Sequence, residues 1–168
     1  YSPPKLTYCT NDKYSTRFNP NLYRNGKVCI SILNTWKGDQ WTSCQSISSI
    51  LLTLCTVLND KPLLNEPNIT EEYRDFNKYN YIITYRNFEH SILYVYKHPE
   101  KFSEFHFFYE IINKHYIDNE SKIISKIKDM KEKNFKPVSM SLYDMQCSLN
   151  YTELLKKYEK KKRCAGKD

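Results

Sequence analysis

The residues of this chain that could carry out covalent chemistry are its cysteines and histidines. The cysteines are irregularly spaced and contain no C-x-x-C pair, which argues against a zinc or redox site; they are Cys9, Cys29, Cys44, Cys55, Cys147 and Cys164. The histidines all fall in the second half, without a cluster of acids or cysteines, as structural or surface histidines do; they are His90, His98, His106 and His115. No phosphate-binding loop, H-E-x-x-H motif or G-x-S-x-G motif occurs. Taken singly, each cysteine is more typical of a buried core residue than of a nucleophile.

One cysteine stands in an ordered series of motifs. Asn19-Pro20-Asn21 precedes Cys29, with Asn21 eight residues before the thiol, and the pattern G-x-V-C-I-x-I-L surrounds it over residues 26–33. Two tryptophans lie in the loop that follows, and Asn65-Glu66-Pro67 comes after the next predicted helix. The order and spacing of these motifs, more than any one of them, single out Cys29.

The series resembles the active-site signature of ubiquitin-conjugating enzymes, in which a His-Pro-Asn triplet stands eight residues before the catalytic cysteine. Trp41-Thr42-Ser43 takes the place of the family's Trp-Ser-Pro, and Glu66 takes the place of the acidic residue at the gate of the site. At the front, Tyr1-Ser2-Pro3-Pro4-Lys5 is similar to the end of the family's Y-P-x-x-P-P-K segment. The resemblance extends from Tyr1 to Pro67, about 40% of the chain.

Three departures narrow the resemblance. Asn19 stands where most members have His, Ser31 stands where most have Asp, and the loop between Cys29 and Trp41 is four residues longer than usual, with the form L-x-x-W-x-G-x-x-W. Together these features are similar to the Z-type conjugating enzymes and to the conjugating domain of the giant inhibitor-of-apoptosis proteins.

The chemistry that the resemblance implies is transthiolation. Cys29, as the thiolate, takes the C-terminal acyl group of ubiquitin from an activating enzyme, and a substrate lysine or a ligase thiol then attacks the thioester. The resemblance makes Asn21 the amide beside the cysteine, either an oxyanion donor or a brace for the loop. It makes Glu66 the acid that orients the incoming lysine, although an ordinary surface carboxylate is the alternative for this residue.

The resemblance also implies partners and no cofactor. The partners are ubiquitin or a ubiquitin-like modifier, an activating enzyme, a ubiquitin ligase and protein substrates. By the same resemblance, the residues expected to contact the ligase and the activating enzyme are Tyr1, Trp41, Thr42, Ser43 and Cys44. Ser43 replaces the family's proline and leaves this contact loop less rigid. Because the family begins with a helix and two strands before its Pro-Pro-Lys segment, we expect this chain to be truncated at its N-terminus.

The elements that must position these residues predict an α+β fold, similar to that of the family: an antiparallel β-meander, with its first strands missing from this chain, followed by several helices. Alternation over Lys5–Cys9 and a β-branched apolar run over Val28–Leu33 predict strands. A helix over 43–58 is predicted to begin at a capping box of Thr42 and Gln45. Its apolar stripe is expected to face the strands and consists of Ile47, Ile50, Leu51, Leu54, Val57 and Leu58.

Further helices are expected over 70–98, with a break, from Pro99 onward, over 121–133 and over 151–162. One catalytic domain over 1–163 and a basic tail over 164–168 are expected. The net charge of +7 is concentrated near that end, where the lysines suit a solvated helix terminus better than a nucleic-acid surface. The apolar runs are too short for a membrane span, and no signal peptide is visible.

Wide cysteine spacing favours reduced thiols and a cytoplasmic or nuclear location over a disulfide framework. Two other functions remain open at this stage. One is a non-catalytic adaptor of the same fold that binds ubiquitin or ligases, although such variants lack the cysteine. The other, supported only by net charge and the lysine-rich end, is a basic nucleic-acid-binding domain.

Overall fold

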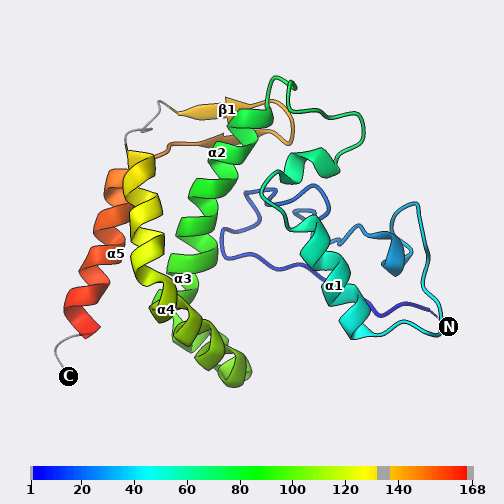
Figure 1. Ribbon diagram of the computed structural model, residues 1–168, viewed down its shortest axis with the longest axis horizontal. Helices are drawn as coiled ribbons and strands as arrows, with labels where there is room; N and C mark the ends of the chain where they lie inside the picture. Colours follow the sequence, from blue (N-terminus) through cyan, green and yellow to red (C-terminus); the bar gives the residue numbers. More distant parts are fainter. Residues whose placement is uncertain (1, 132–136, 166–168) are drawn as a thin grey trace. The chain divides into compact units, whose positions relative to one another are not determined.

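A computed structural model describes residues 2–131 and 137–165 of the chain (Figure 1). Its elements are α1 (Ile47–Val57), α2 (Phe76–Arg86), α3 (Tyr94–Lys97), α4 (His106–Lys131), β1 (Val138–Met140), β2 (Met145–Cys147) and α5 (Tyr151–Ala165). Four residues connect β1 to β2, so the pair is an antiparallel hairpin. Helices together with this sheet confirm the predicted α+β class. No helix within the described ranges is both long and apolar enough to cross a membrane.

The chain divides into two compact units. The first runs to Ile83 and also contains Met140–Met145, which is the turn of the hairpin with one residue of each strand. The second contains Thr84–Ser139 and the chain from Gln146 onward. Every residue predicted for the catalytic site falls in the first unit.

The core of the first unit lies where the segment around Cys29 packs against α1. Tyr8, Trp41, Leu54 and Val57 pack around its buried members, which are Leu22, Val28, Ile30, Ile32, Leu33 and Ile50. This cluster confirms that α1 covers the segment that carries the thiol.

Two details of the predicted helix over 43–58 are wrong. The helix begins at Ile47, with Ser46 at its N-cap, because the Ser46 N–H donates to Ser49 Oγ at 3.2 Å. The predicted box at Thr42 and Gln45 closes a separate turn just upstream. The apolar stripe is also only partly buried: Ile50 is 3% exposed, whereas Leu51 is 57% exposed. A helix of this length turns only a narrow face to the core, and Leu51 lies beside that face.

The segments predicted as strands, Lys5–Cys9 and Val28–Leu33, do not form regular strands. Within the described chain their residues take part only in isolated bridges: Thr7 pairs with Lys27, and Val28 pairs with Leu22. Gly26 permits the close approach: its φ is +86°, and a Cβ there would lie 2.9 Å from the Thr7 methyl carbon. Ser31–Leu33 turns into a 3₁₀ helix because the Thr35 hydroxyl, rather than a neighbouring strand, accepts the Ile30 N–H at 3.0 Å.

The helical part of the chain is also more continuous than predicted. The helix expected over 70–98 starts at Phe76 and not at residue 70. In place of the predicted break, the π-helical segment Asn87–Leu93 connects α2 to α3. Pro99 opens a 3₁₀ segment over Pro99–Phe105, which leads into α4. The helix predicted over 121–133 is the second half of α4, because no breaker interrupts residues 106–131. The helix predicted at 151 is α5.

Tyrosines hold the second unit together. In it α4 and α5 run side by side (Figure 1). The ring of Tyr116 on α4 stacks on Tyr96, with centroids 3.7 Å apart, and faces Tyr158 of α5 at 6.4 Å. The Tyr158 hydroxyl donates to the Phe88 carbonyl oxygen at 2.6 Å, which satisfies a buried phenol and fastens α5 to the π-helical segment.

Glu89 adds an ionic link in the same unit. Its carboxylate pairs with Arg86 at 3.0 Å, His90 at 3.3 Å and Lys157 of α5 at 3.5 Å. The hydrogen bond from His90, together with the charges of His90, Arg86 and Lys157, outweighs the effect of burial and lowers the pKa of Glu89 from 4.5 to about 2.

Ile50→Ala and Leu51→Ala form a matched pair on α1. Burial of Ile50 predicts that its truncation lowers the free energy of unfolding by about 2–5 kcal/mol. Exposure of Leu51 predicts a change within about 0.5 kcal/mol. Urea unfolding of the two variants measures both effects. Equal decreases in the free energy of unfolding would show that Ile50 is no more buried than Leu51, which contradicts the described core.

Glu89→Gln is expected to change how stability depends on pH. Because the folded pKa lies below the unfolded one, ionised Glu89 stabilises the fold above pH 4.5, and this contribution disappears as the pH falls toward 2. The variant should therefore be less stable than the wild type at pH 7, by on the order of 2 kcal/mol after solvent screening, and the gap should close toward pH 2. Denaturation over this pH range tests it, with exposed Glu104→Gln as the control, and a gap independent of pH would contradict it.

Candidate active site

The turn before the predicted nucleophile is built around the side chain of Asn19. This residue is 1% exposed, and its Oδ1 accepts the Asn21 N–H at 2.8 Å. Its Nδ2 donates to the carbonyl oxygen of Val57, the last residue of α1, at 2.7 Å. The loss of the imidazole that most of the family has here therefore leaves the loop firmly packed, because the carboxamide supplies both an acceptor and a donor.

Two hydrogen bonds join Asn21 to the backbone of Cys29. The Cys29 N–H donates to the Asn21 carbonyl oxygen at 2.8 Å, and Asn21 Nδ2 donates to the Cys29 carbonyl oxygen at 2.7 Å. Asn21 Oδ1 is buried and has no hydrogen-bond partner among the described residues. The predicted pair is thus brought together, and the bracing contribution of the Asn21 side chain is visible in the geometry.

Cys29 itself is 4% exposed, and its Sγ lies 3.0 Å from the Thr35 carbonyl oxygen, to which the thiol donates. The Thr35 hydroxyl also lies 2.8 Å from the Val28 carbonyl oxygen. The beginning of the long loop after the cysteine is therefore folded back onto the cysteine. All five cysteines whose side chains the structure describes are free thiols, and Cys29 is the one placed beside Asn21.

Glu66 lines the same hollow as Cys29. It follows the 3₁₀ turn Pro62–Asn65, and its N–H donates to the Leu63 carbonyl oxygen at 3.1 Å. The preceding Asn65 side chain donates to the Val57 carbonyl oxygen at 2.9 Å. The three predicted catalytic residues then share one narrow hollow, whose lining consists of Pro20, Asn21, Tyr23, Cys29, Trp36, Asn65 and Glu66.

Tyr143 is a site residue that the sequence reasoning missed. It lies in the turn of the hairpin, in the first unit, and its hydroxyl donates to Glu66 Oε1 at 2.5 Å. Burial and then the Glu66 carboxylate raise the pKa of Tyr143 far above its usual value, so the phenol stays a donor. No motif could have found it, since 77 residues separate the two partners.

The residues expected to contact a ligase or an activating enzyme differ in exposure. Thr42, Ser43 and Cys44 are exposed. Trp41 is half-buried and packs on the core of the first unit, while its N–H donates to Asn34 Oδ1 at 2.8 Å. Tyr1 lies outside the described residues.

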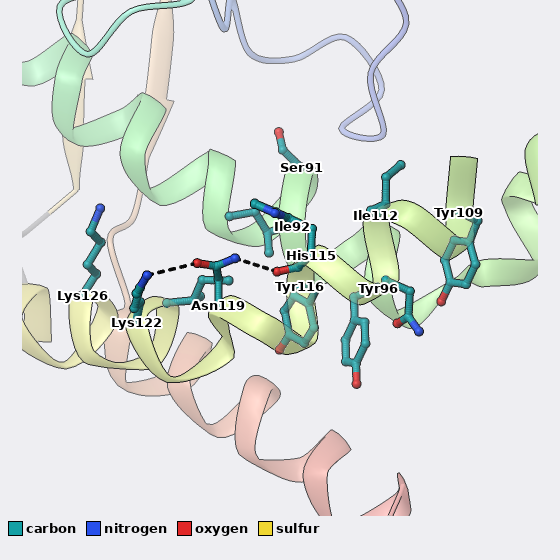
Figure 2. Close-up of a pocket in the computed structure, with 12 residues that line it drawn as sticks. Ser91, Ile92, Tyr96, Tyr109, Ile112, His115, Tyr116, Asn119, Lys122 and Lys126 are labelled. Atoms are coloured by element: carbon teal, nitrogen blue, oxygen red, sulfur yellow. Dashed lines mark hydrogen bonds between the residues drawn. The ribbon is translucent and has the colours of Figure 1, made fainter. Parts of the chain in front are cut away.

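A second hollow belongs to the other unit. It is a groove of about 390 Å³ lined by residues of α4, of α3 and of the π-helical segment before α3 (Figure 2). Tyr96, Tyr109 and Tyr116 line it together with isoleucines, and Lys122 and Lys126 stand at one end. The groove is mostly apolar and no cysteine lines it, so it offers no second site for thiol chemistry.

Comparisons with known proteins agree with this geometry. The family model "Ubiquitin-conjugating enzyme" matches residues 1–83. Over this part the chain belongs to the ubiquitin-conjugating enzyme family, and the resemblance predicted from the motifs around Cys29 is confirmed.

Individual relatives narrow the family to its Z-type branch. Human ubiquitin-conjugating enzyme E2 Z is 44% identical over 79 residues, which is 47% of this chain and 22% of that protein. The human dual E2 ubiquitin-conjugating enzyme/E3 ubiquitin-protein ligase BIRC6 is 47% identical over 73 residues, 39% of this chain and 2% of that protein. The probable ubiquitin-conjugating enzyme protein 17 of Caenorhabditis elegans is 34% identical over 126 residues, 68% of this chain and 16% of that protein. The chain thus spans about a fifth or less of the length of these relatives.

Asn19→Ala tests whether the buried carboxamide holds the site together. The Asn21 N–H loses its acceptor and the Val57 carbonyl oxygen loses one donor, so the free energy of unfolding should fall by about 1–3 kcal/mol. Urea denaturation gives the value. Asn11→Ala, at an exposed position of the same unit, should stay within about 0.5 kcal/mol of the wild type. If the two variants unfold alike, the link through Val57 contributes nothing to stability.

Proposed function

We propose that this protein is a ubiquitin-conjugating enzyme. It accepts ubiquitin, or a ubiquitin-like modifier, from an activating enzyme as a thioester on Cys29 and passes it to a lysine or to a ligase. The observation that carries the proposal is that Glu66, from a separate segment of the sequence, lines the same hollow as Cys29 and Asn21. The relatives' printed names, all of conjugating enzymes, support the same reaction class.

The reaction consists of two acyl transfers. In the first, the Cys29 thiol gives up its proton, its sulfur attacks the thioester carbonyl of ubiquitin on the activating enzyme, and the thiol of that enzyme leaves. In the second, the neutral amine of a lysine attacks the new thioester, an amide bond forms, and Cys29 leaves as the thiolate while the amine loses a proton. Neither transfer changes the oxidation state of any group, and neither needs a cofactor.

Asn21 is suited to contribute to both the structure and the chemistry of the site. A side-chain amide has two N–H groups, and one of them donates to the Cys29 carbonyl oxygen. The second is then the donor for the oxyanion that forms when the thioester is attacked. Glu66 contributes a carboxylate that attracts the lysine ammonium group to the hollow and orients the amine after it loses a proton.

The partners follow from the same proposal. The exposed residues Thr42, Ser43 and Cys44 form the surface for the ligase or the activating enzyme, and Trp41 anchors the loop that carries these three. The resemblance assigns Tyr1 to the same contacts. The substrates are proteins with accessible lysines. We place the protein in the cytoplasm or the nucleus, where thiols stay reduced and an activating enzyme is present.

One observation favours a second candidate, the non-catalytic adaptor. Cys29 is 4% exposed and donates to the Thr35 carbonyl oxygen, so its sulfur is covered more than a nucleophile that meets two large partners would be. An adaptor would bind ubiquitin or a ligase and never form the covalent adduct. The presence of the cysteine beside Asn21 supports the enzyme over the adaptor.

Charging of the full-length protein with ubiquitin, ATP and an activating enzyme distinguishes the two. We expect an adduct one ubiquitin heavier than the protein, which disappears under reducing agent. Cys29→Ser should give an adduct that resists reduction or no adduct, because an ester replaces the thioester. Exposed Cys9→Ser and Cys55→Ser should charge like the wild type. Reducible charging of Cys29→Ser would disprove the assignment of the nucleophile, and no charging of the wild type by a panel of activating enzymes would favour the adaptor.

A further inference from the structure

The turn that carries Tyr143 is held in a costly conformation. Between β1 and β2 the Asp144 N–H donates to the Ser141 carbonyl oxygen at 3.2 Å, and the φ angles of Tyr143 and Asp144 are +68° and +46°. A left-handed conformation is unusual for a bulky residue such as tyrosine and has to be supported by the surrounding structure. The conformation of the turn therefore determines where the Tyr143 side chain lies, which is beside Glu66.

Asp75 supplies much of that support. It is 1% exposed, and its Oδ2 accepts the Ser141 N–H at 3.2 Å, the Leu142 N–H at 3.2 Å and the Ser141 hydroxyl at 3.1 Å. Burial raises the pKa of Asp75, but these hydrogen bonds and Lys78 outweigh that effect and hold the pKa below its usual value. An ionised carboxylate beneath the turn fixes its backbone.

The ring of Tyr143 is fixed as well. The Arg17 guanidinium lies 4.8 Å from its centroid, and Tyr79 packs against it edge to face at 5.9 Å. Arg24 also donates to the Tyr143 carbonyl oxygen at 2.6 Å. With backbone and ring both held, the hydroxyl oxygen stays within hydrogen-bond distance of Glu66 Oε1.

We propose that Tyr143 is a positioning residue for the transfer of ubiquitin to lysine, and that it acts by holding the Glu66 carboxylate at the edge of the hollow that contains Cys29. This inference rests on the proposed function of Cys29 and deepens it by saying how the carboxylate of Glu66 is oriented. Glutamate has three rotatable side-chain bonds, and a carboxylate that is not held spends most of its time turned away from the thioester. A carboxylate has two oxygens; the phenol occupies Oε1, and Oε2 receives the N–H of the incoming lysine.

The hydroxyl of Tyr143 should therefore matter for an acceptor that arrives as a cation and not for the loading of Cys29. Lysine reaches the site as an ammonium ion that a carboxylate attracts. Hydroxylamine is uncharged at neutral pH and attacks a thioester without help from a carboxylate. The comparison of these two acceptors separates a role in orienting the amine from a general effect on the fold.

The experiment is single-turnover discharge of the ubiquitin-charged full-length protein to free lysine and, separately, to hydroxylamine. Tyr143→Phe removes only the hydroxyl, and we expect normal charging, about tenfold slower discharge to lysine at saturating acceptor and unchanged discharge to hydroxylamine. Glu66→Gln should behave similarly. Tyr143→Phe added to Glu66→Gln should slow lysine discharge no further, because without the carboxylate of Glu66 the phenol has no acid left to position. Exposed Tyr14→Phe is the matched control and should match the wild type throughout.

Either of two results would overturn the inference, as would an unchanged rate of lysine discharge in Tyr143→Phe. One is equal slowing of lysine and hydroxylamine discharge in Tyr143→Phe, since this would show a general effect on the site. The other is a full additional loss in the Glu66→Gln background, since Tyr143 would then act without Glu66. Failure of the proposed function looks different, because the wild type would form no thioester on Cys29. If Tyr143→Phe charges normally and discharges to lysine at the wild-type rate, the proposed conjugating activity stands and only the role of Tyr143 is disproved.

Discussion

The carbonyl oxygen of Val57 is the point on which the site depends. The last residue of a helix has a carbonyl group with no partner inside the helix, and here two side chains satisfy it: Asn19 Nδ2 at 2.7 Å and Asn65 Nδ2 at 2.9 Å. Asn19 belongs to the turn that leads to Asn21 and Cys29, whereas Asn65 directly precedes Glu66. The end of α1 thus connects the segment that carries Asn21 and Cys29 with the segment that carries Glu66, and all three residues line the same hollow.

This connection explains why a short helix with much exposed apolar surface suffices. Only Ile50 of α1 is fully buried, with Leu54 and Val57 packed beside it, so hydrophobic packing determines where the helix lies but not how the loops at its end are oriented. Hydrogen bonds are directional and supply that orientation. Asn19 also explains how the usual imidazole of the family is replaced: the carboxamide both accepts from Asn21 and donates to Val57.

The thiol is held under the same kind of restraint. Thr35 accepts a hydrogen bond from Sγ with its carbonyl oxygen and from the Ile30 N–H with its hydroxyl, so the loop that departs from Cys29 immediately returns to it. Because the loop folds back over it, Cys29 is only 4% exposed. Trp36 of the same loop lines the hollow and is 45% exposed, so the approach of a partner to the sulfur involves the residues that make this chain's loop longer than is usual in the family.

The sequence by itself predicted Cys29 as the nucleophile with Asn21 and Glu66 as its companions, because these three residues occur in an ordered series of local motifs. It also predicted the α+β class and the helices that later form α1, α4 and α5, since amphipathic periodicity and caps act over a few residues. Local signals failed where pairing between segments decides: Lys5–Cys9 and Val28–Leu33 have strand-like composition, yet only bridges form, and Leu51 lies in a helical stripe but remains exposed. The tertiary structure alone brought Tyr143 to Glu66 and supported its left-handed backbone on Asp75, because contacts across 77 and about 66 residues depend on how the whole unit folds and leave no trace in the residues beside either partner.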